Sequence, residues 1–271
     1  MRAVPPLAVM FLLAAPAVRS ATEPVAGEVA PGGVVRWAGP ELDACEAGGR
    51  RWQPFDGACW FPVDLDATGE LELVRRSSAG VASRRVRVAA YPYPTQELNV
   101  DEKYVAPSPA DLERIARERE RVVALFALET PRRFTLPLAP PLAPLPGAGR
   151  FGARRIFNGE PRSPHSGADY SATPGTTVFA PAAGRVALAE EQYFAGRAVF
   201  VDHGGGLLSM SFHLSELLVA PGDEVERGQP IGRVGATGRV TGPHLHFGLR
   251  WHGARVDPAL LLAERAPVEI R

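Results

Sequence analysis

The strongest constraint on the fold comes from the C-terminal part of the chain, where glycines and short apolar runs replace any helical pattern. From Phe151 onward, no apolar stripe with helical spacing appears before Pro258. Short apolar runs bounded by turn residues are typical of strands. The pattern therefore predicts a mostly antiparallel β domain over residues 148–262, followed by a short tail at 263–271. The expected strands are 177–180, 185–188, 199–202, 231–234 and 244–249.

The N-terminal part also carries a strand pattern. Leu71 and Leu73 alternate with glutamates, and Val86 and Val88 alternate with arginines, which is the period-two signal of half-buried strands. Glycine-containing turn sequences separate these runs. We therefore expect a small β-sandwich over residues 21–100. No catalytic group of residues stands out in it.

A connecting helix is expected within residues 101–130. Ser108 can cap it, Pro109 suits its first turn, and Asp111 completes a capping box. We expect this helix to be a solvated connector that packs on one side, rather than a helix that binds a partner. A proline-rich linker, expected to be stiff and extended, follows at 131–147. The apolar stripe of the helix comprises Leu112, Ile115, Ala116, Val122, Val123 and Phe126.

Residues 1–20 have the pattern of a secretory signal peptide. Arg2 supplies a positive start, an apolar stretch follows, and small residues precede a cleavage point between Ser20 and Ala21. A membrane anchor is the alternative, but the apolar run is shorter than the roughly 20 residues that span a bilayer. We expect an exported protein, in the periplasm of a Gram-negative cell or secreted, with no stable membrane insertion after cleavage.

Cysteine content and charge agree with export. Cys45 and Cys59 are the only cysteines, and an even count in an oxidising compartment favours a disulfide over two separate buried thiols. The 30 basic and 30 acidic residues give a formal net charge of zero. There is therefore no overall electrostatic case for nucleic acid or for an anionic membrane as partner.

Three of the six histidines lie in a pattern that favours a catalytic zinc site. His244 and His246 are two apart, so both imidazoles point to one face if the segment is a strand. His165 lies four before Asp169 in a segment that Pro164 makes extended rather than helical. Two imidazoles and a carboxylate leave a fourth zinc position open for water. A closed structural site with His244 as fourth ligand is the strained alternative.

Several segments together resemble the lysostaphin/LytM-type zinc endopeptidases. They are Pro-His-Ser-Gly-Ala-Asp-Tyr at 164–170, Phe-His-Leu-Ser at 212–215 and Thr-Gly-Pro-His-Leu-His-Phe at 241–247. The resemblance keeps its order from about Phe151 to Pro258, and the preceding region is similar, less specifically, to some Gram-negative members. The helical His-Glu-x-x-His pattern of zincins is absent from the chain.

The resemblance implies a zinc metallopeptidase that cuts peptide crosslinks or stem peptides of peptidoglycan. It implies zinc ligation by His165, Asp169 and His246. His213 and His244 would be the two active-site histidines that do not bind zinc. His244 would accept a proton from the attacking water, and His213 would stabilise the oxyanion or protonate the leaving amine; which of the two is the base stays open. The Gram-negative character favours a D,D-endopeptidase acting on stem peptides with meso-diaminopimelate.

Two positions depart from the family pattern. Ser211 stands where many members have tyrosine, and Gly248 stands where many have an acidic residue. Of the remaining histidines, we expect His203 to be a locally hydrogen-bonded turn residue and His252 to lie exposed at a hairpin tip. The alternative function is a non-catalytic peptidoglycan-binding regulator or amidase activator. We also expect the N-terminal region to position or shield the cleft.

Overall fold

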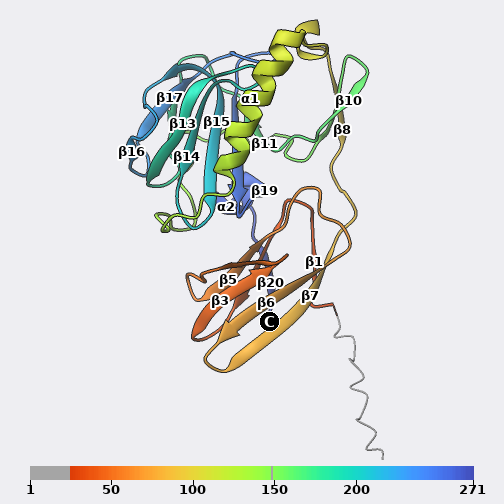
Figure 1. The fold of residues 1–271 in the computed structure, drawn as a ribbon, viewed down its shortest axis with the longest axis vertical. Helices are drawn as coiled ribbons and strands as arrows, with labels where there is room; N and C mark the ends of the chain where they lie inside the picture. Colours follow the sequence, from red (N-terminus) through yellow and green to blue (C-terminus); the bar gives the residue numbers. More distant parts are fainter. Residues whose placement is uncertain (1–24, 148) are drawn as a thin grey trace, which may run out of the picture.

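The computed structural model describes residues 25–147 and 149–271, and most of its regular structure is β (Figure 1). This confirms the predicted fold class. The signal peptide expected at 1–20 lies outside the described residues. Within the described residues, no helix is both long and apolar enough to cross a bilayer.

The N-terminal part is a sandwich of two sheets with a shared apolar core. A five-stranded sheet has the order β1-β7-β6-β3-β4, and a three-stranded sheet has the order β20-β2-β5. The predicted alternation holds, since Leu73 and Val86 are buried between the sheets. The first seven strands are β1 (Glu28–Val29), β2 (Val34–Ala38), β3 (Leu42–Ala47), β4 (Arg50–Trp52), β5 (Ala58–Pro62), β6 (Glu70–Ser77) and β7 (Gly80–Val88).

A disulfide joins the two sheets of the sandwich. It links Cys45 on β3 to Cys59 on β5, and both residues are completely buried in the core. The predicted pairing is therefore confirmed. The C-terminal residues complete the same sandwich, because β20 (Val268–Ile270) pairs in parallel with β2. The segment expected as a tail thus returns to the N-terminal part and fastens the chain end there (Figure 1).

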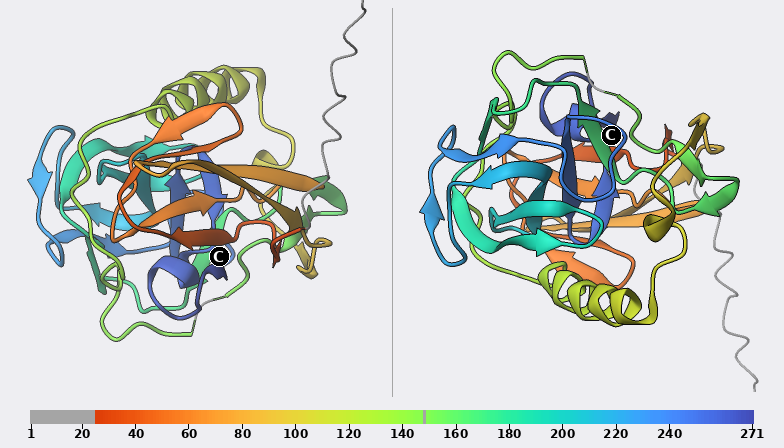
Figure 2. Two further views of the ribbon diagram at one scale, coloured as in Figure 1. Left: turned by 90° about the horizontal axis from the view of Figure 1, so that it is seen from below. Right: turned by 90° about the horizontal axis from the view of Figure 1, so that it is seen from above.

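The connecting segment contains β8 (Thr95–Leu98), a 3-10 turn (Glu102–Tyr104) and α1 (Pro109–Leu125). Ser108 caps α1, with its hydroxyl oxygen accepting from the Asp111 backbone N–H. The helix lies on the outside of the C-terminal sheet (Figure 2). Only the end of the expected stripe packs against that sheet, through Val122 and Phe126. Leu112 and Val123 are more than half exposed, so the predicted stripe was too wide.

The proline-rich segment is packed against the C-terminal part along its length. Its prolines prevent a regular ladder, but Phe134, Leu138 and Leu142 are buried in the core of that part. Backbone bonds fasten it as well, since the Leu138 N–H donates to Leu261 O and the Ala139 N–H donates to Pro181 O. The segment therefore belongs to the C-terminal core and does not hang free between two units.

The C-terminal part is built on a nine-stranded sheet whose main path is β11-β18-β15-β14-β13-β16. Neighbours along this path are antiparallel, as predicted. β17 pairs with β15 and with β12, and β19 pairs with β18. A separate three-stranded sheet, β10-β9-β8, joins the chain before α1 to the chain after the proline-rich segment. The elements are β9 (Arg154–Phe157), β10 (Glu160–Arg162), β11 (Gly167–Tyr170), β12 (Thr177–Phe179), β13 (Gly184–Gln192), β14 (Gly196–Asp202), β15 (Leu207–Leu217), β16 (Glu224–Val225), β17 (Pro230–Val234), β18 (Leu245–Trp251), β19 (Ala254–Val256) and α2 (Pro258–Leu261).

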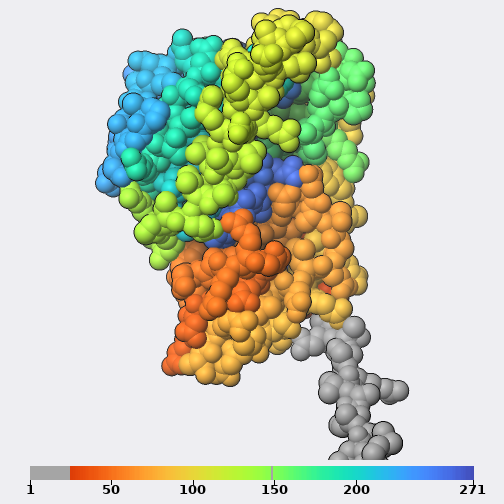
Figure 3. Space-filling model, in the orientation of Figure 1, coloured from red at the N-terminus to blue at the C-terminus, as the bar shows by residue number. Residues whose placement is uncertain are grey.

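The two parts are in continuous contact (Figure 3). Trp60 of the sandwich belongs to the same apolar cluster as Trp251 of β18, with ring centroids 6.1 Å apart. Asp64 of the sandwich accepts hydrogen bonds from the backbone and side chain of Arg255 on β19. Together with the β20 return strand, these contacts hold the sandwich against the edge of the C-terminal sheet.

Candidate metal centre

Strand register brings the predicted metal ligands together. His246 lies on β18, directly opposite Asp169 of β11 on one side and Phe212 of β15 on the other. Directly opposed residues place their side chains on the same face of a sheet. The Phe212 ring stacks on the His246 imidazole, with centroids 5.1 Å apart and planes 7° from parallel. His246 is therefore held from one side while its Nδ1 faces the carboxylate.

Three donor atoms converge at this point of the sheet. His165 Nε2 lies 2.8 Å from His246 Nδ1, and Asp169 Oδ1 lies 3.0 Å from the first and 2.9 Å from the second. Ligands on a tetrahedral zinc ion are separated by about 3.3 Å, so a small outward adjustment would admit the ion. Within the residues that the structure describes, these three are the only group of this kind. His244 is not one of them, so the donor set matches the open zinc layout.

A backbone hydrogen bond fixes which nitrogen of His165 faces the donor group. Its Nδ1 lies 2.9 Å from Arg150 O. Since a carbonyl can only accept, Nδ1 carries the proton in the neutral ring and Nε2 presents its lone pair. A metal-ligating histidine commonly has such a partner on its other nitrogen. The side chain is only 1% exposed, and burial lowers its pKa to about 4, so the neutral ring is favoured.

Asp169 is held as a carboxylate. Burial alone would raise its pKa, but hydrogen bonds with His165 and His246 outweigh burial and move the pKa well below its usual range. Its second oxygen, Oδ2, accepts a hydrogen bond of 3.0 Å from Arg155 Nη2 on β9. Oδ1 therefore remains for the metal while Oδ2 is bound by the guanidinium.

His213 sits at an irregularity of β15 that turns its side chain toward this site. The register between β14 and β15 shifts beside it, and its φ is +65°, a left-handed conformation that is uncommon for residues other than glycine. Its Nδ1 donates to Thr237 O at 2.9 Å, which leaves Nε2 as an acceptor. Burial, with the neighbouring His246 and His244, lowers its pKa to about 3.

His244 precedes β18 and faces the same donor group. Its Nδ1 donates to Gly242 O, and its Nε2 lies 3.6 Å from Asp169 Oδ1. The rings of His213 and His244 have centroids 4.9 Å apart. Both residues line a cavity of about 390 Å³ that also reaches Asp169. The five residues expected from the sequence are thus brought together. His165, Asp169 and His246 form a donor triangle, and His213 and His244 lie beside it.

The cavity wall contains residues that carried no signal in the sequence. Arg155 and Phe157 on β9 line it, as do Gln96 and Leu98 on β8, which precede α1 in the chain. Arg239 lines it from the loop between β17 and β18. The N-terminal half of the chain therefore contributes directly to the candidate site through the β8–β9 pairing.

The two departures from the family pattern are both accommodated. Ser211 is buried and lies outside the cavity lining. Gly248 pairs with Gly167, and a Cβ at Gly248 would come within 2.9 Å of the Met210 methyl carbon. Gly248 has no side chain, so no carboxylate at this position can accept a hydrogen bond from a residue of the site. Asp169 itself is supported by Arg155.

The two remaining histidines both have side chains that are covered by the protein. His203 is completely buried, with Nδ1 2.9 Å from Ala183 O and Nε2 2.8 Å from the Ser209 hydroxyl, so it is apart from the donor group. His252 lies at the β18–β19 turn, but the expectation that it is exposed was wrong, because its side chain is 6% exposed. Its ring stacks on Trp52 of the sandwich, which covers it.

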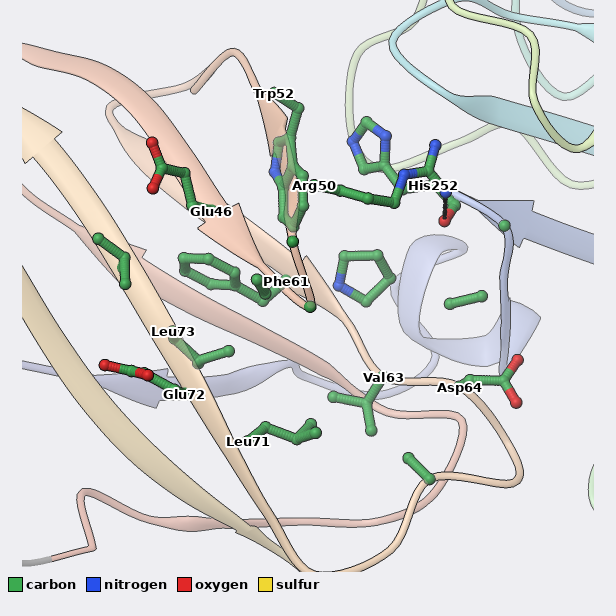
Figure 4. A pocket seen from close by; sticks show the side chains of 18 of the residues that line it. Glu46, Arg50, Trp52, Phe61, Val63, Asp64, Leu71, Glu72, Leu73 and His252 are labelled. Carbon is green, nitrogen blue, oxygen red and sulfur yellow. Dashed lines mark hydrogen bonds between the residues drawn. The ribbon is translucent and has the colours of Figure 1, made fainter.

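His252 also borders a hollow of about 1090 Å³, larger than the cavity lined by His213 and His244, between the sandwich and the β18–β19 turn (Figure 4). Trp52, Phe61 and Leu71 give this hollow an apolar wall, and Glu46 and Glu72 lie at its margin. It contains none of the residues of the donor triangle. Size alone would have selected the wrong place for the chemistry.

Comparison with known proteins places this site in a family. Residues 163–258 match peptidase family M23. The crystal structure of a Pseudomonas aeruginosa protein assigned to peptidase M23 is 33% identical, with a TM-score of 0.66, over 86% of this chain and 94% of that one. The chain belongs to peptidase family M23. The predicted family is thereby confirmed, and the likeness covers the sandwich as well as the catalytic sheet.

Two curated relatives each match part of the chain. Peptidoglycan DD-endopeptidase ShyA of Vibrio cholerae is 40% identical over 111 residues, which is 41% of this chain and 26% of the relative. DD-carboxypeptidase/endopeptidase Mpg of Neisseria meningitidis serogroup B is 43% identical over 94 residues, 35% of this chain and 22% of the relative. The chain therefore spans about a quarter of the length of these relatives.

Proposed function

We propose that this M23 protein is an exported zinc metalloendopeptidase that hydrolyses peptide crosslinks of peptidoglycan. The observation that carries the proposal is the convergence of His165 Nε2, Asp169 Oδ1 and His246 Nδ1 within 3.0 Å of one another. Two further histidines face the same cavity without joining the donor group. This is the donor chemistry of catalytic zinc, with a position left for water.

The residues around the donor group have complementary tasks in this proposal. A bound zinc ion would supply a Lewis acid and lower the pKa of a coordinated water to about 7. His244, whose Nε2 lies near Asp169, would take the proton from the attacking water. His213, whose ring lies beside that of His244, would then stabilise the oxyanion or pass a proton to the leaving amine.

The substrate class is supported by the relatives. ShyA and Mpg are both named for action on D,D bonds, and each is at least 40% identical to this chain over the roughly 100 residues that match. A D,D-crosslink joins a D-alanine carbonyl to the side-chain amine of diaminopimelate in a neighbouring stem peptide. We infer that this is the bond cleaved here. Action on peptidoglycan also fits export to the periplasm.

Zinc content and muropeptide release should be measured on the same preparations. We expect about one zinc per chain and release of uncrosslinked muropeptides from purified crosslinked peptidoglycan. His246→Ala should lose zinc and lower the hydrolysis rate by at least about 1000-fold, because the two remaining donors cannot hold the ion alone. Mass spectrometry of the products identifies the bond.

His252→Gln is the matched control, because this histidine is buried outside the donor group. It should keep both zinc and hydrolysis. Zinc bound at full occupancy without any cleavage would contradict the proposal. That outcome would instead favour the non-catalytic regulator, although all five site residues are intact in this chain.

A further inference from the structure

Arg239 stands in the wall of the active-site cavity with no acidic partner. Its guanidinium carbon lies 4.7 Å from the ring centroid of Phe157 and 4.4 Å from that of Phe194, so the side chain is held between two aromatic rings. Within residues 25–147 and 149–271, no carboxylate forms an ion pair with it. Its nitrogens are not among the buried polar atoms that lack a partner, and the side chain lines both this cavity and a second hollow beside Tyr104 and Arg162.

The nearest charges make this position more positive. Arg155 and Arg162 both repel Arg239, and burial together with this repulsion lowers the pKa of Arg239 to about 10. Arg155 is already paired with Asp169, and Arg162 donates to the backbone oxygens of Val105 and Pro161. The guanidinium of Arg239 is thus the member of this group that remains free to bind an anion from the cavity.

Arg239 lines the same cavity as Asp169 and His244. Phe157 separates it from Arg155, whose guanidinium carbon is 5.9 Å from the same ring centroid and whose Nη2 binds Asp169. One aromatic ring and one arginine therefore lie between Arg239 and a metal ligand. A substrate whose scissile carbonyl faces Asp169 can therefore reach Arg239 along the wall of the same cavity.

The backbone around Arg239 is fixed before any ligand binds. The Arg239 N–H donates to Phe194 O, and Gly238 has φ +75°, where a Cβ would come within 2.3 Å of Gly196 N. Thr237 accepts from the Arg197 N–H and donates to Leu214 O. The same residue accepts from His213 Nδ1. The loop that positions a catalytic histidine therefore also positions the free guanidinium, which reduces the ordering cost of binding.

We propose that Arg239 binds the carboxylate of the residue on the leaving-amine side of the scissile bond. This rests on the proposed function and adds the feature of the substrate that is recognised. In a D,D-crosslink, the carbon that carries the scissile nitrogen also carries a free carboxylate. A terminal D-alanine presents a carboxylate at the same place, whereas the interior of a glycine bridge presents none. Arginine suits this task because its planar fork matches a carboxylate.

Two matched crosslinked peptides test the proposal, one with that carboxylate free and one with it converted to the primary amide. The wild-type protein should have a KM about 10- to 100-fold lower for the free acid, the usual effect of one charged hydrogen-bonded pair. Arg239→Gln should remove this preference, so that the ratio of kcat/KM for the acid and the amide falls to about one. Arg239→Lys should keep part of it. Arg185→Gln, an exposed arginine of β13, is the control and should keep all of it.

A second measurement separates this inference from the proposed function. If the wild type cleaves neither peptide, calorimetric binding of the same two peptides still tests Arg239. A preference for the free acid that Arg239→Gln abolishes would support the subsite even then. Equal binding of acid and amide by the wild type, or an unchanged preference in Arg239→Gln, would overturn it.

Discussion

The sandwich and the catalytic sheet are both built from β-strands, but they differ in what they bury. Among the described residues 25–100, no charged side chain, histidine, serine or amide is fully buried. The catalytic sheet and its surroundings bury four histidines, His165, His203, His213 and His246, together with serines and acidic side chains. A buried polar group is costly unless it is hydrogen-bonded. The fold therefore concentrates its positioned polar groups in one of its two parts.

The difference shows how each part obtains a unique structure. The sandwich is specified by apolar alternation and by one disulfide between its sheets. In the catalytic sheet, backbone carbonyls fix individual rings, as Arg150 O does for His165 and Thr237 O does for His213. Irregular backbone at His213 is tolerated because the surrounding strands determine it. Changes in the two parts should therefore have separable effects.

Removing the disulfide should give the largest stability effect. It closes a loop with a sequence separation of 14, so the Cys45→Ser/Cys59→Ser double variant should unfold about 3 kcal/mol more easily. Denaturant unfolding measures the loss, and wild type under reducing conditions should match the variant. Zinc content at low temperature should stay unchanged. Loss of zinc in parallel with the disulfide would show that the two parts are not separable.

Acid should weaken the catalytic sheet first. Burial lowers the pKa of His203 to about 4, whereas an unfolded histidine titrates near about 6.5. Because the folded pKa is the lower one, the stabilisation is fully present above about pH 6.5 and is lost as the pH falls toward 4. At pH 5 the loss from this residue should be about 1–2 kcal/mol.

The matched variant for this effect is His203→Gln. The unfolding free energy should fall between pH 7.5 and pH 5 by about 1–2 kcal/mol less in the variant than in the wild type. All six histidines lie at residue 165 or later, so the sandwich has no equivalent group. An identical pH dependence in both proteins would contradict the role given to the buried ring.

Much of this architecture could be predicted from local sequence patterns, such as apolar residues at every second position. The alternation around Leu71 and Val86, the Ser108 cap and the Cys45–Cys59 pair are all found as expected. The donor residues could be identified because His165, Asp169 and His246 occur in motifs with family-specific order. Register then explains their convergence, since Asp169 and His246 are opposed on paired strands.

Other features depend on tertiary structure that no local pattern encodes. The longest strand, β15, was not among the expected strands, because it is buried on both faces and so does not alternate. Arg155 binds Asp169 only because β8 and β9 form a separate sheet beside the site. The burial of His252 depends on Trp52, 200 positions away in the chain, and its own neighbours gave no sign of it.

The smallest effect is expected where the two halves of the chain meet at the cavity. Leu98 and Val100 belong to the N-terminal half and line the cavity beside the β8–β9 pairing. We propose that they shield the site from bulky substrates. The Leu98→Ala/Val100→Ala variant should then raise turnover of intact crosslinked peptidoglycan a few-fold, with no change for a small soluble crosslinked peptide. The ratio of the two rates is the quantity to measure.

This design is preferable to deleting the N-terminal half. A chain starting near Leu145 would lack Phe134, Leu138 and Leu142, which are buried in the catalytic core, so lost activity would only report misfolding. Val81→Ala provides the control, because this valine is 60% exposed on the sandwich. A fall in both rates would mean that β8 positions the substrate. An unchanged ratio would mean that the β8 wall restricts nothing, and that the N-terminal half contributes to the site only by holding Arg155 against Asp169.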